Sequence, residues 1–436
     1  MEKARLLEIL VDWNLWENEL EEGIPRGKYL RPFVSISKTG MVMILTGPRR
    51  CGKSTLLIQF MKNLVKNGTN PRDILLINLE DYRFSTTNID LLDEIYRTFL
   101  EKVHGSKTPY IFLDEVHRIE GWERFVRTLV DGKKATVCVT GSSSQLLSKE
   151  LATVLTGRHL DITIFPLDFR EFLKFKGFEV GDELRATGQK IKIIRFLEEY
   201  LEFGGFPEVV LNKTKKQILL RYYQDILMKD IIGRYKVRVI DKLNTLAGFY
   251  LANAGNRITF QSMTRFLGIS LRTVERFSTY LEEAYMIFLI KKFHPSLKEQ
   301  EKSPRKVYVV DNGIVNMVGF RISDNYGRGL ENLVFLELKR RMAIEEDLDI
   351  YYWADTKDRE VDFVLKKGKS DYELIQVCYD IRDPSTKERE LKPLLKAMSE
   401  FNVKTATIIT WDLEQVEVIK GKRILYRPAW KWLLGL

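Results

Sequence analysis

The stretch ILTGPRRCGKSTLL, residues 44–57, decides the fold, because a loop rich in glycine and basic residues joins an apolar run to a helix start. Residues 47–54 match the pattern GxxxxGK[ST] at every fixed position, with a predicted strand before and a predicted helix after. Glycines let the backbone approach phosphates closely, and successive N–H groups at a helix N-terminus bind anions. A chance glycine-rich turn is the alternative. The residues expected to bind the phosphates are Gly47, Pro48, Arg49, Arg50, Cys51, Gly52, Lys53, Ser54 and Thr55.

Two side chains of this loop have separate predicted roles. Lys53 is expected to reach the β- and γ-phosphates of a nucleoside triphosphate as a point charge. The Ser54 hydroxyl is expected to bind Mg²⁺, with Thr55 next in line. The loop therefore predicts a bound triphosphate together with a magnesium ion.

An acidic pair follows the strand-like run in YIFLDEVHRI, residues 110–119. Asp114 is expected to hold Mg²⁺ through water, and Glu115 is expected to polarise the water that attacks the γ-phosphate. The alternative is an ordinary buried strand that ends in a solvated acidic pair. Glu80 and Asp81 end an earlier predicted strand and are weaker candidates for tuning the same site.

Polar residues after the next strands are candidate sensors of the γ-phosphate. Ser142 in VTGSSSQLL is favoured, with Thr140 as the second choice. A serine-rich turn that caps a helix starting near Ser144 explains the same residues equally well. Arg158 is a candidate arginine finger acting in trans or a sensor acting in cis, and an ordinary surface arginine is the alternative.

Strand and helix patterns alternate through the first 165 residues. This alternation predicts an α/β fold with a mostly parallel sheet covered on both faces. A helix over residues 2–20 is expected to precede it, followed by a loop through residues 23–32. The predicted strands are 41–46, 73–79, 109–113, 135–140 and 159–165.

The order of these motifs resembles the ATPase module of the archaeal and bacterial AAA+ (STAND-like) P-loop ATPases. GPRRCGKST, IFLDEV, TGSSS and GR…PLDFREF occur in that order within residues 40–170, and GGFPEVV is typical of the family's lid region. The resemblance implies a five-stranded core in the order 5-1-4-3-2, ATP as the nucleotide, and ring-like homo-oligomers. We expect an ATPase core with its N-terminal helix at 1–170 and a helical lid at 171–234.

Residues 257–293 are expected to fold as helix, tight turn, helix and strand, and we predict a winged helix-turn-helix domain over 235–300. Ser270 is a credible N-cap of the second helix. In DNA-binding proteins that helix enters the major groove, where Arg272, Thr273 and Arg276 would be presented. The alternative is a packing module without a DNA-binding role, which Glu275 on the same helix favours.

Residues 301–436 form a third predicted α/β domain. Residues 305–412 resemble the domain of unknown function that commonly follows such ATPases and that looks like the PD-(D/E)XK nuclease fold. The resemblance assigns Glu331 and Asp362 to metal binding, but the expected carboxylate and lysine are replaced by Gln376 and Cys378. A thiol is mostly neutral at pH 7 and cannot replace an ammonium group. We therefore expect a degenerate domain that does not cleave.

Composition restricts the function less than the motifs do. The chain has 70 Lys+Arg against 60 Asp+Glu, a net charge of +10 that fits a polyanionic partner without requiring one. Three scattered cysteines, Cys51, Cys138 and Cys378, indicate a reducing compartment. The charged N-terminus does not match a signal peptide, and no apolar run reaches the roughly 18–20 residues of a membrane helix.

The sequence thus predicts a cytoplasmic, Mg²⁺-dependent ATPase that acts on or near DNA or RNA, with no membrane partner. Two alternatives stay open: an ATP-dependent signalling or defence switch, and an ATP-regulated, metal-dependent nuclease.

Overall fold

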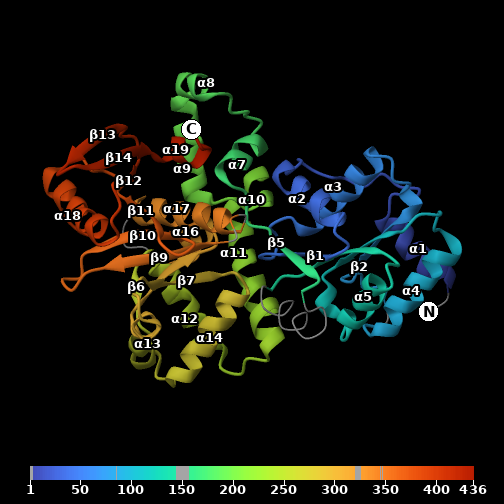
Figure 1. Ribbon diagram of the computed structural model, residues 1–436. Helices are drawn as coiled ribbons and strands as arrows, with labels where there is room; N and C mark the ends of the chain where they lie inside the picture. Colours follow the sequence, from blue (N-terminus) through green and yellow to red (C-terminus); the bar gives the residue numbers. More distant parts are fainter. Residues whose placement is uncertain (1–2, 85, 144–156, 320–325, 344, 346) are drawn as a thin grey trace. The chain divides into compact units, whose positions relative to one another are not determined.

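Two units make up the chain, Met1–Ile164 (unit 1) and Phe165–Leu436 (unit 2), and each has its own sheet (Figure 1). The computed structural model describes residues 3–84, 86–143, 157–319, 326–343, 345 and 347–436. In that part of the chain, no helix combines the length and the apolar character needed to cross a membrane.

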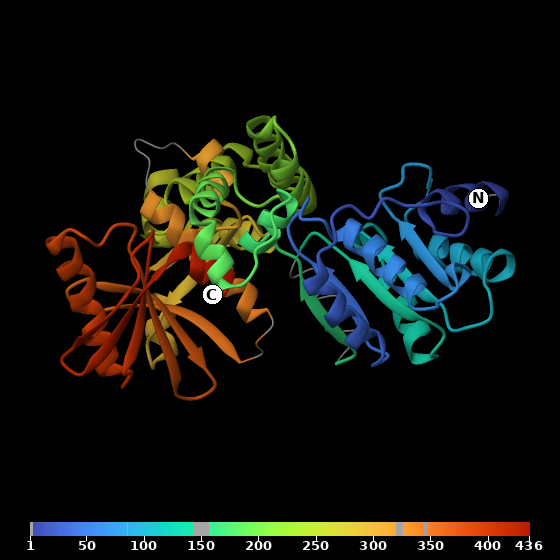
Figure 2. The ribbon, with the colours of Figure 1, turned by 90° about the horizontal axis from the view of Figure 1, so that it is seen from above.

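The sheet of unit 1 has five parallel strands in the order β2-β3-β4-β1-β5, which confirms the order that the family resemblance implies. Figures 1 and 2 show it from two directions. All five predicted strands are present, with bounds that differ by at most a few residues. The strands are β1 (Val42–Thr46), β2 (Ile74–Asn78), β3 (Tyr110–Asp114), β4 (Thr136–Thr140) and β5 (His159–Thr163).

Helices cover both faces of this sheet. Successive strand residues such as Ile44 and Leu45 belong to different hydrophobic clusters, because side chains alternate between the faces. One face packs against α1 (Lys3–Trp13), α4 (Ile89–Lys102) and α5 (Trp122–Asp131), and the other against α2 (Gly27–Ser37) and α3 (Lys53–Lys66). A parallel sheet buried on both sides is the predicted α/β arrangement.

The N-terminal helix is shorter than predicted. It ends at Trp13, well before residue 20. The Asn14 side chain donates to the Leu10 carbonyl at 2.7 Å and bonds both backbone groups of Leu76 in β2, at 2.9 and 2.7 Å. These bonds to β2 compete with continuation of the helix, as asparagine side chains commonly do.

The loop predicted through residues 23–32 is only partly correct, because α2 begins at Gly27 and has Pro32 in its interior. Proline inside a helix removes one backbone hydrogen bond. Phe33 is fully buried and its ring stacks on Phe60 at 4.0 Å between centroids. This packing against α3 offsets a local sequence preference that disfavours the helix.

Unit 2 contains a mixed sheet of nine strands in the order β13-β14-β12-β11-β10-β9-β7-β8-β6 (Figure 1). Strand β7 pairs in parallel with β9, so one sheet runs through segments on both sides of residue 300. The strands are β6 (Arg257–Ile258), β7 (Ile287–Lys292), β8 (Arg305–Val309), β9 (Leu348–Ala354), β10 (Glu360–Lys367), β11 (Asp371–Val377), β12 (Thr405–Thr410), β13 (Gln415–Ile419) and β14 (Lys422–Pro428).

The helices of unit 2 include the predicted pair separated by a tight turn. Gly268 ends α13 with a left-handed φ of 65°, and the Ser270 side chain caps α14 by accepting from the Thr273 N–H, as predicted. The helices are α7 (Phe169–Phe175), α8 (Glu183–Gly188), α9 (Lys190–Phe203), α10 (Pro207–Leu211), α11 (Lys215–Asp225), the π-helix η3 (Ile226–Gly233), α12 (Ile240–Ala252), α13 (Phe260–Leu267), α14 (Leu271–Glu283), α15 (Leu297–Lys302), α16 (Asn312–Val318), α17 (Tyr326–Met342), α18 (Pro384–Glu400) and α19 (Ala429–Leu434).

Candidate functional site

The glycine-rich loop connects the end of β1 to the start of α3. Gly47 has a φ of 138°, and a Cβ there would lie 2.1 Å from the carbonyl oxygen of Ile164. Gly52 has a φ of 97° and is the N-cap residue of α3. Both positions therefore require glycine, and the loop leads directly into the positive end of a helix.

Lys53 lies inside this loop with only 5% of its surface exposed. Its Nζ donates to the carbonyl oxygens of Gly47 and Pro48, at 3.0 and 3.1 Å. Oε1 of Glu115 lies 3.9 Å from the same nitrogen. The ammonium group is thus held mainly by neutral acceptors, which phosphate oxygens can replace.

The acidic pair at the end of β3 lies next to the loop. Asp114 and Glu115 are 5% and 7% exposed. Thr140, at the end of the neighbouring β4, donates its hydroxyl to Oδ1 of Asp114 at 2.5 Å and accepts from the Glu115 N–H at 2.9 Å. Glu115 has a left-handed φ of 54°. The second-choice residue, Thr140, is therefore the one that links both acidic residues, and the favoured Ser142 is a fully buried neighbour.

Asp114 is a buried carboxyl group beside a second carboxylate. Burial is the main cause that raises the pKa of Asp114, with a further contribution from Glu115, while hydrogen bonds from Thr140 and Ser54 oppose the rise. Ser54 and Asp114 are therefore in contact, and both offer the oxygen ligands that Mg²⁺ prefers. The residues present fit a magnesium ion at this place.

A buried arginine that sequence reasoning missed supports the loop. Arg26 precedes α2, is 4% exposed, and donates from a guanidinium nitrogen to the Cys51 carbonyl oxygen at 2.8 Å. Its backbone N–H donates to Gln59 on α3 at 3.1 Å. Nothing in the local sequence marks Arg26, since it lies about twenty residues before the motif. Burial raises the pKa of the Cys51 thiol, so this cysteine is a neutral packing residue.

Glu80, a weaker candidate, contacts two arginines of the same region. Its Oε1 lies 3.3 Å from Arg49 of the loop and 2.9 Å from Arg118, which follows the acidic pair. Burial would raise the pKa of Glu80, but hydrogen bonds and charge from these arginines lower it. Asp81, the other weak candidate, instead bonds Arg83.

Arg158 is not brought to the loop of its own chain. Its carbonyl accepts from the N–H of Val42 at 2.9 Å, which places it beside the start of β1, whereas the loop follows the end of that strand. Its side chain forms an ion pair with Asp131. The helix expected near Ser144 lies outside the described residues.

In unit 2, the two residues assigned to metal binding meet at a lysine. Glu331 lies on α17 and Asp362 on β10, and each has an oxygen 2.7 Å from Nζ of Lys306 on β8. Glu360 on β10 has an oxygen 3.1 Å from the same nitrogen. The expectation for Glu331 and Asp362 placed these side chains together, but it missed Lys306, which has 0% exposure.

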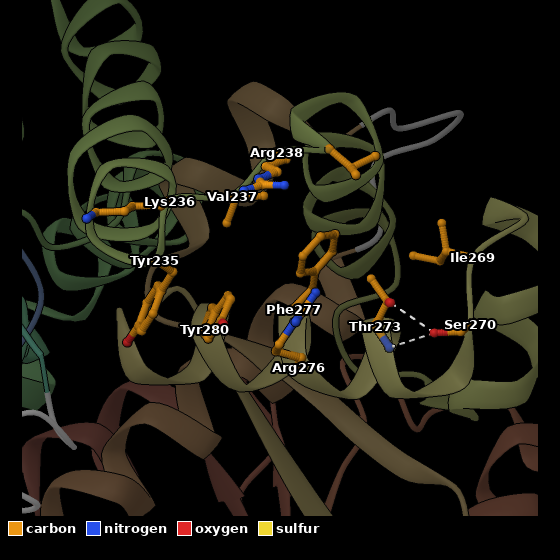
Figure 3. Close-up of a pocket in the computed structure, with 11 residues that line it drawn as sticks. Tyr235, Lys236, Val237, Arg238, Ile269, Ser270, Thr273, Arg276, Phe277 and Tyr280 are labelled. Atoms are coloured by element: carbon orange, nitrogen blue, oxygen red, sulfur yellow. Dashed lines mark hydrogen bonds between the residues drawn. The ribbon is translucent and has the colours of Figure 1, made fainter.

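The candidate DNA-contacting helix, α14, carries exposed Arg272 and Arg276. Beside it is a pocket of about 440 Å³ that Thr273 and Arg276 line together with residues 235–239 (Figure 3). The rings of Tyr235 and Tyr280 stack at its wall, with centroids 3.7 Å apart and 5° between their planes.

Three family matches cover most of the chain. Residues 39–173 match a family described as AAA domain. Residues 194–325 and 326–430 match two families, each described as a domain of unknown function (DUF8612 and DUF4143).

Similar proteins occur in archaea and bacteria. An uncharacterized protein of Methanocaldococcus jannaschii is 36% identical over 407 residues, which cover 90% of this chain and 88% of the relative. An uncharacterized protein of Haemophilus influenzae is 29% identical over 415 residues, covering 93% and 98%. Among solved structures, a Walker-type ATPase of Pyrococcus abyssi is 13% identical with a TM-score of 0.46 over 68% of this chain and 95% of its own. AMPPCP-bound DnaA of Aquifex aeolicus is 16% identical with a TM-score of 0.28 over 62% and 92%.

Proposed function

Because the chain belongs to one family with the Methanocaldococcus jannaschii relative and its residues 39–173 match an AAA domain, we propose that it hydrolyses ATP in a Mg²⁺-dependent reaction at residues 47–55. The observation that carries the proposal is the cluster of Lys53, Asp114, Glu115 and Thr140. These buried residues are linked in a chain of contacts, Lys53 to Glu115 and Thr140 to both acidic residues. Asp114, Glu115 and Thr140 lie at the ends of β3 and β4, and Lys53 begins the helix that follows the loop after β1.

Each residue has a defined task in this proposal. The loop N–H groups bind the phosphates, and Lys53 exchanges its two carbonyl partners for phosphate oxygens. Ser54 and Asp114 would hold Mg²⁺, which when bound supplies positive charge to the triphosphate. Glu115 orients and polarises the attacking water. Thr140 positions both acidic residues.

Arg158 would act from a neighbouring copy of the chain, in a homo-oligomer such as a ring. Two facts support this part of the proposal. Arg158 lies at the end of the strands opposite to the loop, beside the start of β1, and its side chain is more than half exposed. An arginine supplied in trans can raise the rate of phosphoryl transfer by several powers of ten. Mixing Arg158→Ala with Lys53→Ala protein tests this arrangement, because the two defects lie on different chains.

The decisive experiment uses Glu115→Gln, which keeps the shape of the side chain and removes its charge. ATP turnover should fall by about 10²- to 10⁴-fold, and bound ATP should persist on the protein after gel filtration. Glu120→Gln, an exposed residue just before α5, is the matched control and should behave as wild type. Normal turnover of radiolabelled ATP by Glu115→Gln would contradict the role of Glu115.

Nucleic acid is the partner that we propose for the region around α14, within the winged-helix domain proposed for residues 235–300. Between residues 234 and 280 the chain has eight Lys or Arg and two Asp or Glu, so this short segment carries much of the excess positive charge. Lys236, Arg238, Arg272 and Arg276 are exposed, and within the described residues none of them forms an ion pair with a carboxylate. The pocket of Figure 3 adds stacked aromatic rings, to which bases can bind.

A salt series tests this partner. The ATPase rate and the affinity for single- and double-stranded DNA and for RNA should be measured at several salt concentrations, because phosphate contacts weaken as ionic strength rises. Arg276→Ala should weaken binding and lower the salt slope by about one. Arg195→Ala, exposed on α9, is the control. A protein that turns over ATP but binds no nucleic acid favours the ATP-dependent switch instead.

We propose a helical lid for residues 171–234. For residues 301–436 we propose a nuclease-like domain that does not cleave nucleic acid. The order of α17, the antiparallel strands β9 to β11, α18 and the parallel β12 supports that fold. Gln376 and Cys378 stand in place of a carboxylate and a lysine, which supports the absence of cleavage.

A further inference from the structure

The nuclease-like domain has a positively charged group where its proposed fold would place a metal ion. Lys306 extends from β8 between Glu331, Glu360 and Asp362. The lysine ammonium has three N–H donors and no acceptor. It donates hydrogen bonds to Glu360 and Asp362, at 3.1 and 2.7 Å, and forms an ion pair with Glu331 at 2.7 Å, so carboxylates surround the group.

The carboxylate oxygens of this centre have further donors. Tyr308 donates its hydroxyl to the same Glu331 oxygen at 2.6 Å. The second oxygen of Asp362 accepts from the Val377 N–H at 2.9 Å, and that of Glu360 lies 3.1 Å from Arg257. A divalent ion would have to displace these contacts and approach two positive charges.

Gln376 and Cys378, which replace the carboxylate and the lysine of the nuclease motif, form contacts within the protein. Gln376 accepts from the Asp362 N–H at 3.1 Å and donates to Glu390 at 2.7 Å. The Cys378 thiol contacts the Asp380 carbonyl oxygen, and burial raises its pKa to about 12. Neither side chain is available as an anionic ligand at neutral pH.

Exposure distinguishes Lys306 from a relocated catalytic lysine. A cleft of about 400 Å³ is lined by Glu331, Glu360 and Asp362, while Lys306 is not among its lining residues and is 0% exposed. A lysine that acts on a scissile phosphate must reach the substrate, and this one lies behind the carboxylates. Burial alone would lower its pKa, but Asp362, Glu331 and Glu360 outweigh that effect and keep the pKa well above its usual value.

We propose that Lys306 is a built-in cation that takes the place of a divalent metal ion, and that removing its ammonium group turns Glu331, Glu360 and Asp362 into a divalent-cation site. The proposal rests on the nuclease-like fold only for the expected position of a metal. It is independent of ATP hydrolysis by unit 1, so the two can fail separately.

The test is Mn²⁺ binding to the nucleotide-free, full-length protein by calorimetry. Lys306→Ala should bind one Mn²⁺ per chain at least about tenfold more tightly than wild type, a difference of about 1.4 kcal/mol. The gain should disappear in Lys306→Ala/Asp362→Asn. Lys369→Ala, an exposed lysine in the turn between β10 and β11, is the matched control and should show no gain.

If Lys306→Ala does not fold, Mn²⁺ binding and DNA cleavage by the wild-type protein still test the proposal. Wild type should show no Mn²⁺ binding that Asp362→Asn removes, and no Mn²⁺-dependent cleavage of DNA. Mn²⁺ binding or Mn²⁺-dependent cleavage by wild type that is lost in Asp362→Asn would overturn the proposal. A folded Lys306→Ala protein with wild-type Mn²⁺ affinity overturns it as well.

Discussion

Two buried lysines, Lys53 in unit 1 and Lys306 in unit 2, have opposite surroundings. Lys53 is 5% exposed and donates to two backbone carbonyl oxygens, with a carboxylate 3.9 Å away. Lys306 is 0% exposed and bonds three carboxylates at 3.1 Å or less. Both ammonium groups lie beside acidic residues that sequence motifs assign to metal binding.

The difference shows how the partners of a buried charge separate a binding group from a structural one. Neutral carbonyls stabilise an ammonium group weakly, so a triphosphate can compete for Lys53. Three carboxylates around Lys306 leave little to gain from a ligand, and removing one side of such an arrangement leaves buried charge without compensation. The sequence motifs name Lys53 in unit 1 but only the carboxylates in unit 2, so they do not reveal how the charges of unit 2 are compensated.

The largest expected effect is on the stability of unit 2. Lys306→Met should lower the free energy of unfolding of unit 2 by about 3–5 kcal/mol, because the carboxylates lose their cation. Chemical denaturation followed by tryptophan fluorescence measures it, because four of the seven tryptophans (Trp353, Trp411, Trp430 and Trp432) lie in unit 2. ATP binding should persist. Lys369→Met is the control, and equal stability of both variants would contradict a structural role for Lys306.

The complementary change is Lys53→Ala, which should abolish nucleotide binding and lower ATP turnover by about a hundredfold or more. Stability should change by only about 1 kcal/mol, since the partners of Lys53 are neutral carbonyls. Calorimetry with ATP and a denaturation curve separate the two effects. Lys66→Ala at the end of α3 is the control. A large loss of stability would place Lys53 in the same class as Lys306.

A smaller effect is expected at Thr140. Thr140→Val keeps the shape but leaves the Glu115 N–H and an Asp114 oxygen without their partner, which should cost about 1–3 kcal/mol. ATP turnover should fall about tenfold or more, with Thr140→Ser restoring most of it. Turnover that is lower in Thr140→Val and unchanged in Thr140→Ser would identify the hydroxyl as the positioning group. Equal turnover in all three proteins would contradict that role.

The last prediction extends the comparison to Glu282, a half-buried acid whose cationic neighbours Arg305 and Lys339 do not outweigh the effect of burial on its pKa. Burial raises the pKa of Glu282 on α14 to about 7, although the Leu289 N–H bonds its carboxylate. The folded state therefore retains a proton that the unfolded state releases near pH 4.5, so stability is highest below that pH and falls as the pH rises through about 7. The loss is at most about 1.4 kcal/mol per pH unit.

Glu282→Gln mimics the protonated acid and keeps an acceptor for Leu289. Its midpoint of thermal unfolding should depend less on pH between 5 and 8 than that of wild type. Glu299→Gln, on exposed α15, is the control. Parallel pH profiles of Glu282→Gln and wild type would contradict the assigned proton.

Much of unit 1 could be predicted from the sequence, because its signals are local. The loop pattern, the apolar runs and the helix periodicity lie within short windows, and the strand order followed from the family resemblance. The length of α1 and the existence of α2 could not be predicted, since Asn14 bonds Leu76 in β2 and Phe33 packs on Phe60, contacts distant in sequence. Thr140 ranked below Ser142 because a sequence does not show which hydroxyl reaches the acidic pair.

The sequence by itself determined which residues are available for chemistry: a glycine-rich loop with a lysine, an acidic pair at a strand end, and two acidic positions in the last domain. Only the tertiary structure decided how those charges are compensated, because Lys306 and Asp362 are 56 residues apart and meet through the pairing of strands in one sheet. Charge compensation depends on distance and burial, and both are set by packing among segments remote in the chain.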